Sequence, residues 1–147
     1  MTVTAKPQLP PFPGSLPRTQ ADWQALLNVT QQWQGAIQAQ KWHAPTLLNG
    51  WAQYTDVNSP WSPPGYLLDV AGTVHLRGML KGGTINTAFF QLPAGYRPLY
   101  RQLMLNLSST NTGVYRVDVT TDGLVLPTAQ TANTWASIDG LSFSILI

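Results

Sequence analysis

From Trp42 onward the chain consists of short strand-like runs that recur about every ten residues, with turn-forming residues between them. The runs are residues 46–54, 65–69, 73–81, 85–92, 100–108, 114–119, 123–126, 134–138 and 141–147. Gly, Pro, Asn and Asp separate them, for example at Asn49-Gly50 and Gly82-Gly83. Short strands joined by turns, with no helical period among them, predict a mainly β fold of the antiparallel β-sandwich or jelly-roll type.

Side-chain alternation supports this prediction in three of the runs. At the C-terminus, four apolar side chains share one face: Leu141, Phe143, Ile145 and Ile147. In residues 101–107 three leucines share a face, and in residues 114–119 one tyrosine and two valines do: Leu103, Leu105 and Leu107, then Tyr115, Val117 and Val119. The run 123–126 is apolar on both faces, so its register is the least determined.

Residues 19–40 are predicted to form an α-helix, which ends before His43-Ala44-Pro45. Thr19 is the expected N-cap, and Asp22 stands three residues later, as in a capping box. Apolar side chains recur at intervals of three and four, with Thr30 completing the spacing, at Trp23, Leu26, Trp33 and Ile37. This is the seam of a short coiled coil of about two heptads.

The helix needs an apolar partner, because most helical stability in proteins comes from packing. It packs either on its own β-domain or on copies of itself around a symmetry axis. Its other faces are rich in glutamine and lack the charge pairs that fix the partner of a coiled coil. The sequence therefore leaves both options open.

Residues 1–18 contain five of the twelve prolines and are predicted to be extended. The segment is either a free tail or an arm that lies across a neighbouring subunit, anchored by Leu9, Phe12 and Leu16. The predicted organisation is thus an extended arm (1–18), an amphipathic helix segment (19–41) and a β-sandwich domain (42–147).

The composition limits the classes of partner. Only 10% of the residues are charged, against about 25% in ordinary globular proteins, which favours a protein of an assembly over a monomer with a neutral surface. The net charge is +2, and the basic residues are scattered, so we expect no nucleic-acid binding. We also expect no export signal and no membrane segment, since no apolar run approaches about 20 residues.

No catalytic, cofactor-binding or metal-binding residues are predicted. The chain has no cysteine, and its two histidines, His43 and His75, lie in no motif. His75 is expected to be a hydrogen-bonded structural residue on a strand face, and Arg97 a structural hydrogen-bond donor. The six carboxylates are dispersed aspartates, so a paired-carboxylate enzyme is not indicated.

Aromatic residues cluster in the loop-rich region 51–66, which contains Trp51, Tyr54, Trp61 and Tyr66. They either fill the core and subunit contacts, which the large buried area of aromatic side chains favours, or form a sugar-stacking platform on exposed loops. In the second case, Trp61 and Tyr66 are the predicted ligand-facing residues.

Six short motifs in residues 46–147 resemble a β-rich module of tailed-phage structural proteins, found at the tips of tail and head fibres and in head-decoration proteins. The motifs are Leu47–Trp51, Pro64–Tyr66, Gly72–Gly78, Lys81–Thr84, Leu92–Pro98 and Trp135–Phe143. The resemblance implies a homotrimeric β-domain displayed on the virion. The residues themselves indicate neither an enzyme nor a cofactor.

The resemblance leaves two functions open. A proline-rich arm and one short helix are too short for a fibre shaft and favour a capsid decoration (cement) protein, which stabilises the phage head through contacts with the major capsid protein or another virion protein. The alternative is an adhesin at the tip of a tail or head fibre, which binds a host-surface glycan.

Overall fold

The computed structural model describes residues 19–38, 40–109 and 113–146. The expected arm at 1–18, with Leu9, Phe12 and Leu16, therefore lies outside the described residues. The elements in chain order are α1 (Gln20–Gln38), β1 (Ala52–Gln53), β2 (Gly65–Leu68), β3 (Thr73–Arg77), β4 (Met79–Lys81), β5 (Phe90–Gln91), the 3-10 helix η1 (Ala94–Tyr96), β6 (Gln102–Leu107), β7 (Val114–Val119), β8 (Leu124–Thr128), β9 (Ala136–Ser137) and β10 (Ser142–Ser144).

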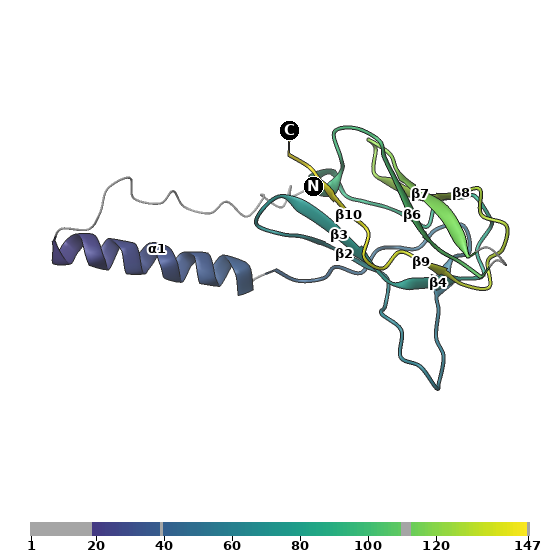
Figure 1. Ribbon diagram of the computed structural model, residues 1–147, viewed down its shortest axis with the longest axis horizontal. Helices are drawn as coiled ribbons and strands as arrows, with labels where there is room; N and C mark the ends of the chain where they lie inside the picture. Colours follow the sequence, from purple (N-terminus) through teal and green to yellow (C-terminus); the bar gives the residue numbers. More distant parts are fainter. Residues whose placement is uncertain (1–18, 39, 110–112, 147) are drawn as a thin grey trace.

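The strands form three small antiparallel sheets around one core (Figure 1). Their orders are β1-β4-β9, β10-β3-β2 and β5-β8-β7-β6. The inward faces of β3 and β10 and those of β7 and β8 contribute to the same apolar cluster, which gives the body a sandwich-like arrangement. The prediction of a mainly β fold behind a helix is confirmed.

Helix α1 begins at the predicted capping box. The Thr19 backbone N–H donates to Asp22 Oδ2 (2.9 Å), and the Asp22 N–H donates to Thr19 Oγ1 (3.1 Å). The helix extends away from the strands (Figure 1) and buries none of its residues. No helix in the described part of the chain is long and apolar enough to cross a membrane.

The alternation predicted for the C-terminal run is confirmed as far as residue 145, because Leu141 and Phe143 are buried and Ile145 is partly buried, while Ser142 and Ser144 are exposed. Ile147, the last residue of the predicted apolar face, lies outside the described residues. The predicted turn at Asn49-Gly50 has positive φ at both residues (52° and 78°), and the Trp51 N–H donates to Leu48 O across it (2.9 Å). This is the backbone of a type I′ turn, which favours Asn-Gly.

The run 73–81 was predicted as one strand, and this is wrong. It divides at Gly78 into β3 and β4, which belong to different sheets. Gly78 has φ +121°, and a Cβ there would lie 2.5 Å from Pro64 Cα. The chain can change sheets at this point because only glycine tolerates both the dihedral angle and the close approach.

Two further predicted strands are mostly irregular. In the run 46–54 only Ala52–Gln53 forms a strand, and in the run 85–92 only Phe90–Gln91 does. Asn86 has φ +59°, which interrupts an extended backbone, and the Asn49-Gly50 turn occupies the middle of the first run. The side chains that made these runs look strand-like fill the core instead, as Trp51 and Phe89 do.

Candidate functional site

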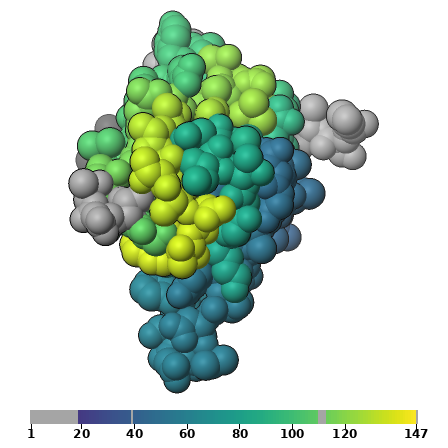
Figure 2. Space-filling model, turned by 90° about the vertical axis from the view of Figure 1, so that its right-hand side faces the viewer, coloured from purple at the N-terminus to yellow at the C-terminus, as the bar shows by residue number. Residues whose placement is uncertain are grey.

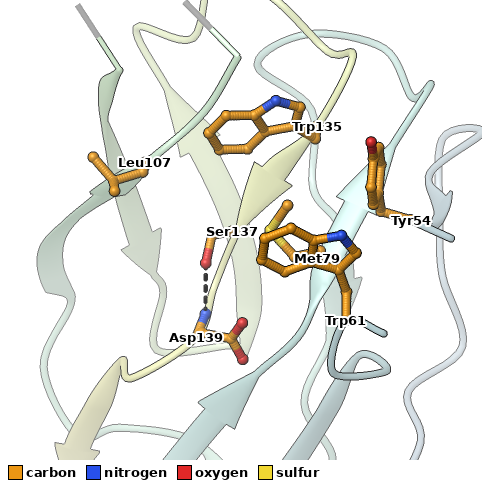
Figure 3. Close-up of a pocket in the computed structure, with 7 residues that line it drawn as sticks. All are labelled: Tyr54, Trp61, Met79, Leu107, Trp135, Ser137 and Asp139. Carbon is orange, nitrogen blue, oxygen red and sulfur yellow. Dashed lines mark hydrogen bonds between the residues drawn. The ribbon is translucent and has the colours of Figure 1, made fainter. Parts of the chain in front are cut away.

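A pocket of about 320 Å³ opens at the sheet formed by β1, β4 and β9 (Figure 3). Its lining residues come from five separate segments: Tyr54, Trp61, Met79, Leu107, Trp135, Ser137 and Asp139. Five of these side chains are apolar or aromatic, and two are polar. The pocket therefore has a largely apolar wall with a polar group at one side.

The loop between β1 and β2 is held at both ends by one residue of β4. The Tyr54 N–H donates to Met79 O (2.9 Å), and the Met79 N–H donates to Ser62 O (3.2 Å). Between these ends the loop projects from the body (Figures 1 and 2), and Val57 near its tip is 100% exposed. The anchoring places Tyr54 and Trp61 side by side at the base of the loop.

The rings of Tyr54 and Trp61 meet edge to face, with centroids 6.3 Å apart and an angle of 77° between their planes. Lys81 Nζ lies 5.6 Å from the Tyr54 ring centroid, within the distance of a cation–π contact. Trp61 is 44% exposed although it is a large apolar residue. An aromatic side chain fixed by neighbours and still accessible is suited to stacking on a ligand.

The polar side of the pocket is Asp139, which follows β9. Its Oδ1 accepts the Gly78 N–H (2.7 Å), and its backbone N–H donates to Ser137 Oγ (3.1 Å, Figure 3). Among the described residues, Oδ2 receives no hydrogen bond. The carboxylate is therefore held in place through one oxygen and can accept a donor from a ligand through the other.

The backbone beneath the pocket is fixed by a buried phenol. The Tyr115 hydroxyl donates to Ser137 O (2.6 Å). Burial raises the pKa of Tyr115 well above its ordinary value, so the phenol stays protonated and remains a donor. Both polar lining residues thus sit on a backbone that is tied to the core.

The structure places Trp61 in the pocket and Tyr66 outside it. The Tyr66 ring stacks on His43 (centroids 5.4 Å apart) and meets Tyr96 edge to face (4.8 Å), and burial is the main cause of its raised pKa. Of the other clustered aromatic residues, Tyr54 lines the pocket, whereas Trp51 is a core residue. The ligand-facing role of Trp61 and Tyr66 stays a prediction.

Sequence reasoning missed the contribution of β9 to the pocket. Trp135, Ser137 and Asp139 alternate along the chain, and the residues between them, Ala136 and Ile138, are fully buried. Alternate residues of an extended segment share one face. The signal in the sequence that could have identified this wall is the alternation of two apolar residues, Ala136 and Ile138, with Trp135, Ser137 and Asp139.

The predicted seam of α1 faces solvent to different degrees. Trp23 and Ile37 are more than half exposed, whereas Leu26 and Trp33 are partly buried. The packing of this seam on copies of the chain stays a prediction. His75 and Arg97 make the expected structural contacts, since His75 Nε2 lies 2.8 Å from Asp69 Oδ2 and Arg97 Nε donates to Leu92 O (2.9 Å).

Comparisons with known proteins found a likeness in the fold. No known family model matches the chain, and no curated protein matches its sequence. The structure is similar to the crystal structure of the receptor binding protein (gp15) of Listeria phage PSA, with a TM-score of 0.62 and 13% sequence identity over 86% of this chain and 80% of that chain. At this identity the match shows a shared fold, and it confirms the resemblance to tailed-phage structural proteins at that level.

Proposed function

We propose that the chain is a structural protein of a tailed-phage virion and acts in the tail as a receptor-binding protein. The observation that carries the proposal is the extent of the structural likeness, which covers 86% of this chain and 80% of the phage receptor binding protein. A match of this extent includes most of the chain rather than one shared motif.

The same observation favours the adhesin over the capsid decoration protein. The decoration hypothesis depended on the shortness of the segment before the β-domain, and nothing in the fold comparison supports it. The similar protein is a receptor binding protein of comparable length. We therefore assign the chain to the tail and expect host contact through the β-domain.

We further propose that the pocket binds a host-surface glycan. A volume of about 320 Å³ is at the lower end of the range of ligand sites, about 300–1,000 Å³, and suits a group of the size of a sugar ring. A sugar ring has an apolar face for Tyr54, Trp61 or Trp135 and hydroxyl donors for Asp139 Oδ2. The adjacent loop 54–64 projects from the surface, where a long cell-wall polymer can reach it (Figure 2).

The first test locates the protein on the virion. Gold-labelled antibody against the chain is expected to mark the tail end of intact particles in electron micrographs. Label distributed over the head would overturn the assignment to the tail and restore capsid decoration.

The second test measures binding of the purified full-length protein to an array of bacterial surface glycans. Trp61→Ala is expected to weaken the binding of the best array ligand by about tenfold or more, because an aromatic anchor in a pocket carries much of the binding energy. Trp61→Phe keeps a ring and should retain most of the affinity. Val57→Ala, on the same loop but fully exposed at its tip, is the matched control and should bind as the unmodified protein does. Equal affinity of Trp61→Ala and the control would exclude the pocket as the glycan site.

A further inference from the structure

Among the described residues that line the pocket, Asp139 is the one that carries a charge. Its carboxylate forms no ion pair within the described part of the chain, where the salt bridges are those of Asp69 and Asp118. Because Oδ1 accepts the Gly78 N–H, the acceptor that remains for a ligand is Oδ2. The pocket therefore presents a negative charge that the described chain does not neutralise.

The position of this carboxylate is fixed by hydrogen bonds to the backbone of Asp139 and to its side chain. The Asp139 N–H donates to Ser137 Oγ (3.1 Å), and the Asp139 carbonyl accepts Asn106 Nδ2 (3.0 Å). The bond from the Gly78 N–H to Oδ1 (2.7 Å) adds a third constraint. A ligand thus meets an acceptor that is already in place, which lowers the entropic cost of binding.

The apolar wall of the pocket contains three aromatic side chains, those of Tyr54, Trp61 and Trp135 (Figure 3). The face of an aromatic ring carries partial negative charge and attracts cations. Tyr54 makes such a contact within the chain, since Lys81 Nζ lies 5.6 Å from its ring centroid. Lys81 also contacts Thr55 Oγ1 (3.4 Å) and is not a lining residue. The aromatic faces and the carboxylate therefore both favour a cation and disfavour an anion.

The cost of covering Asp139 decides between a neutral group and a cationic one. A ligand in the pocket displaces water from the carboxylate, and a carboxylate without water or a counter-charge is costly. A neutral hydroxyl restores one hydrogen bond but no counter-charge, whereas an ammonium group supplies both. A trimethylammonium group would suit the rings but has no N–H to donate to Oδ2. A primary ammonium satisfies the carboxylate and the aromatic wall together.

We propose that the pocket selects a glycan that carries a primary ammonium group, which donates to Asp139 Oδ2 beside the aromatic wall. The proposal rests on the proposed glycan binding and adds the chemical class of the ligand. A primary ammonium occurs on an amino sugar that is not acetylated, or on an aminoacyl ester attached to a surface polymer. N-acetylation removes the charge, so an acetylated host polymer should be bound more weakly.

NMR titration of the full-length protein tests the selectivity with small probes. Methyl glucosaminide is expected to bind at least about tenfold more tightly than methyl glucoside or methyl N-acetylglucosaminide, since it adds a charged hydrogen bond. The preference should decrease at high salt. Alanine methyl ester carries the ammonium group without a sugar ring, and tighter binding of this probe than of methyl glucosaminide would identify the aminoacyl ester as the source.

Two results would overturn the ammonium proposal without deciding the proposed function. The first is binding of methyl glucoside or methyl N-acetylglucosaminide as tightly as methyl glucosaminide, which leaves a glycan site without selectivity for the amine. The second is binding of none of the probes, in which case the glycan array decides separately whether the protein binds a glycan.

Substitution of the carboxylate tests its role. Asp139→Asn keeps an oxygen for the Gly78 N–H but removes the charge, so it should weaken methyl glucosaminide binding by about tenfold and leave the affinity for methyl glucoside unchanged. Asp56→Asn on the projecting loop is the matched control, because it removes the same charge and its Oδ1 also accepts a backbone N–H, that of Asn58 (2.9 Å). Equal effects of the two variants would contradict the proposal. Circular dichroism checks that both variants fold, and the comparison of probes on the unmodified protein needs neither.

Discussion

The substitution Gly83→Ala tests how tightly the chain packs behind the pocket. A Cβ at Gly83 would lie 2.2 Å from Trp51 Cδ2 and 2.3 Å from its Cγ, whereas carbon atoms in contact are about 3.5–4.0 Å apart. The ring or the backbone would have to move by more than about 1 Å. The substitution therefore adds one methyl group where the structure has no space for it.

Neither partner can move easily. Trp51 is 4% exposed, its ring meets Phe89 edge to face at 4.7 Å, and its Nε1–H donates to Thr87 O (3.3 Å). The Gly83 carbonyl accepts Asn133 Nδ2 (2.7 Å), which fixes the backbone. Overpacking a well-packed core costs about 1–3 kcal/mol, and contacts this short with a ring that is held in place indicate about 3 kcal/mol.

The neighbouring glycine provides a matched control. Gly82 has φ +77°, and a Cβ there would meet nothing within 4 Å. Gly82→Ala therefore incurs only the left-handed backbone cost, about 1–2 kcal/mol. The two substitutions add the same methyl group at adjacent positions, one limited by space and the other by the backbone.

Urea and thermal unfolding followed by circular dichroism, at one protein concentration, measure both effects. Gly83→Ala is expected to lower the unfolding temperature by about 6–12 °C, and Gly82→Ala by less. Trp51→Leu removes the indole ring, so Gly83→Ala should cost less in that background, as a double-mutant cycle would report. A Gly83→Ala protein as stable as the unmodified one, or less perturbed than Gly82→Ala, would refute the reasoning.

Two further predictions concern aspartates. At Asp69, burial raises the pKa, but hydrogen bonds from the His75 side chain and the Thr73 backbone outweigh this effect, and the net shift of the pKa is downward. The pKa of Asp69 is therefore lower in the folded than in the unfolded chain. The stability that this carboxylate contributes is present above about pH 4 and is lost as the pH falls through the folded-state pKa. Asp69→Asn should reduce the decrease of the unfolding midpoint between neutral and acid pH. The same pH dependence in the variant and the unmodified protein would contradict this prediction. Asp118→Asn should lower the free energy of unfolding by about 2 kcal/mol in urea titrations, since Arg101 and Arg116 both lose a charged acceptor, whereas a loss below about 0.5 kcal/mol would show that the half-exposed arginines are satisfied by water.

Local chemistry allowed several elements to be predicted from sequence. The reciprocal capping box of Thr19 and Asp22, the Asn49-Gly50 turn and the alternation around Phe143 each depend on residues close together in the chain. The division at Gly78 was not predictable in this way. It depends on the approach of Pro64, which only the folded chain brings near.

The pocket shows the same division between local and distant information. The sequence predicts Trp61 and Tyr66 as ligand-facing residues on the same grounds, since aromatic residues in exposed loops can stack on ligands. Tyr66 packs instead with His43 and Tyr96, residues far from it in the sequence. The carboxylate of Asp139 faces the pocket because Gly78, 61 residues away, holds its other oxygen.

The side of the sheet on which Leu103, Leu105 and Leu107 lie depends on the register between β6 and β7, so it could not be read from the alternation alone. The same pattern fits a register in which the leucines join Val117 and Val119 in the core, and a slip by one residue exchanges the two faces. The observed register instead sets Leu103 opposite Asp118 and Leu105 opposite Arg116. It brings Arg101 to the buried carboxylate of Asp118, which the slipped register would leave without that partner. Arg116, on β7 itself, still pairs with Asp118 in the slipped register, so the loss is one of two charged donors to a buried carboxylate, about 1.5–3 kcal/mol. The hydrogen bond between Arg101 and Asp118 therefore favours the observed register, in which Leu103, Leu105 and Leu107 lie on the outer face of the sheet.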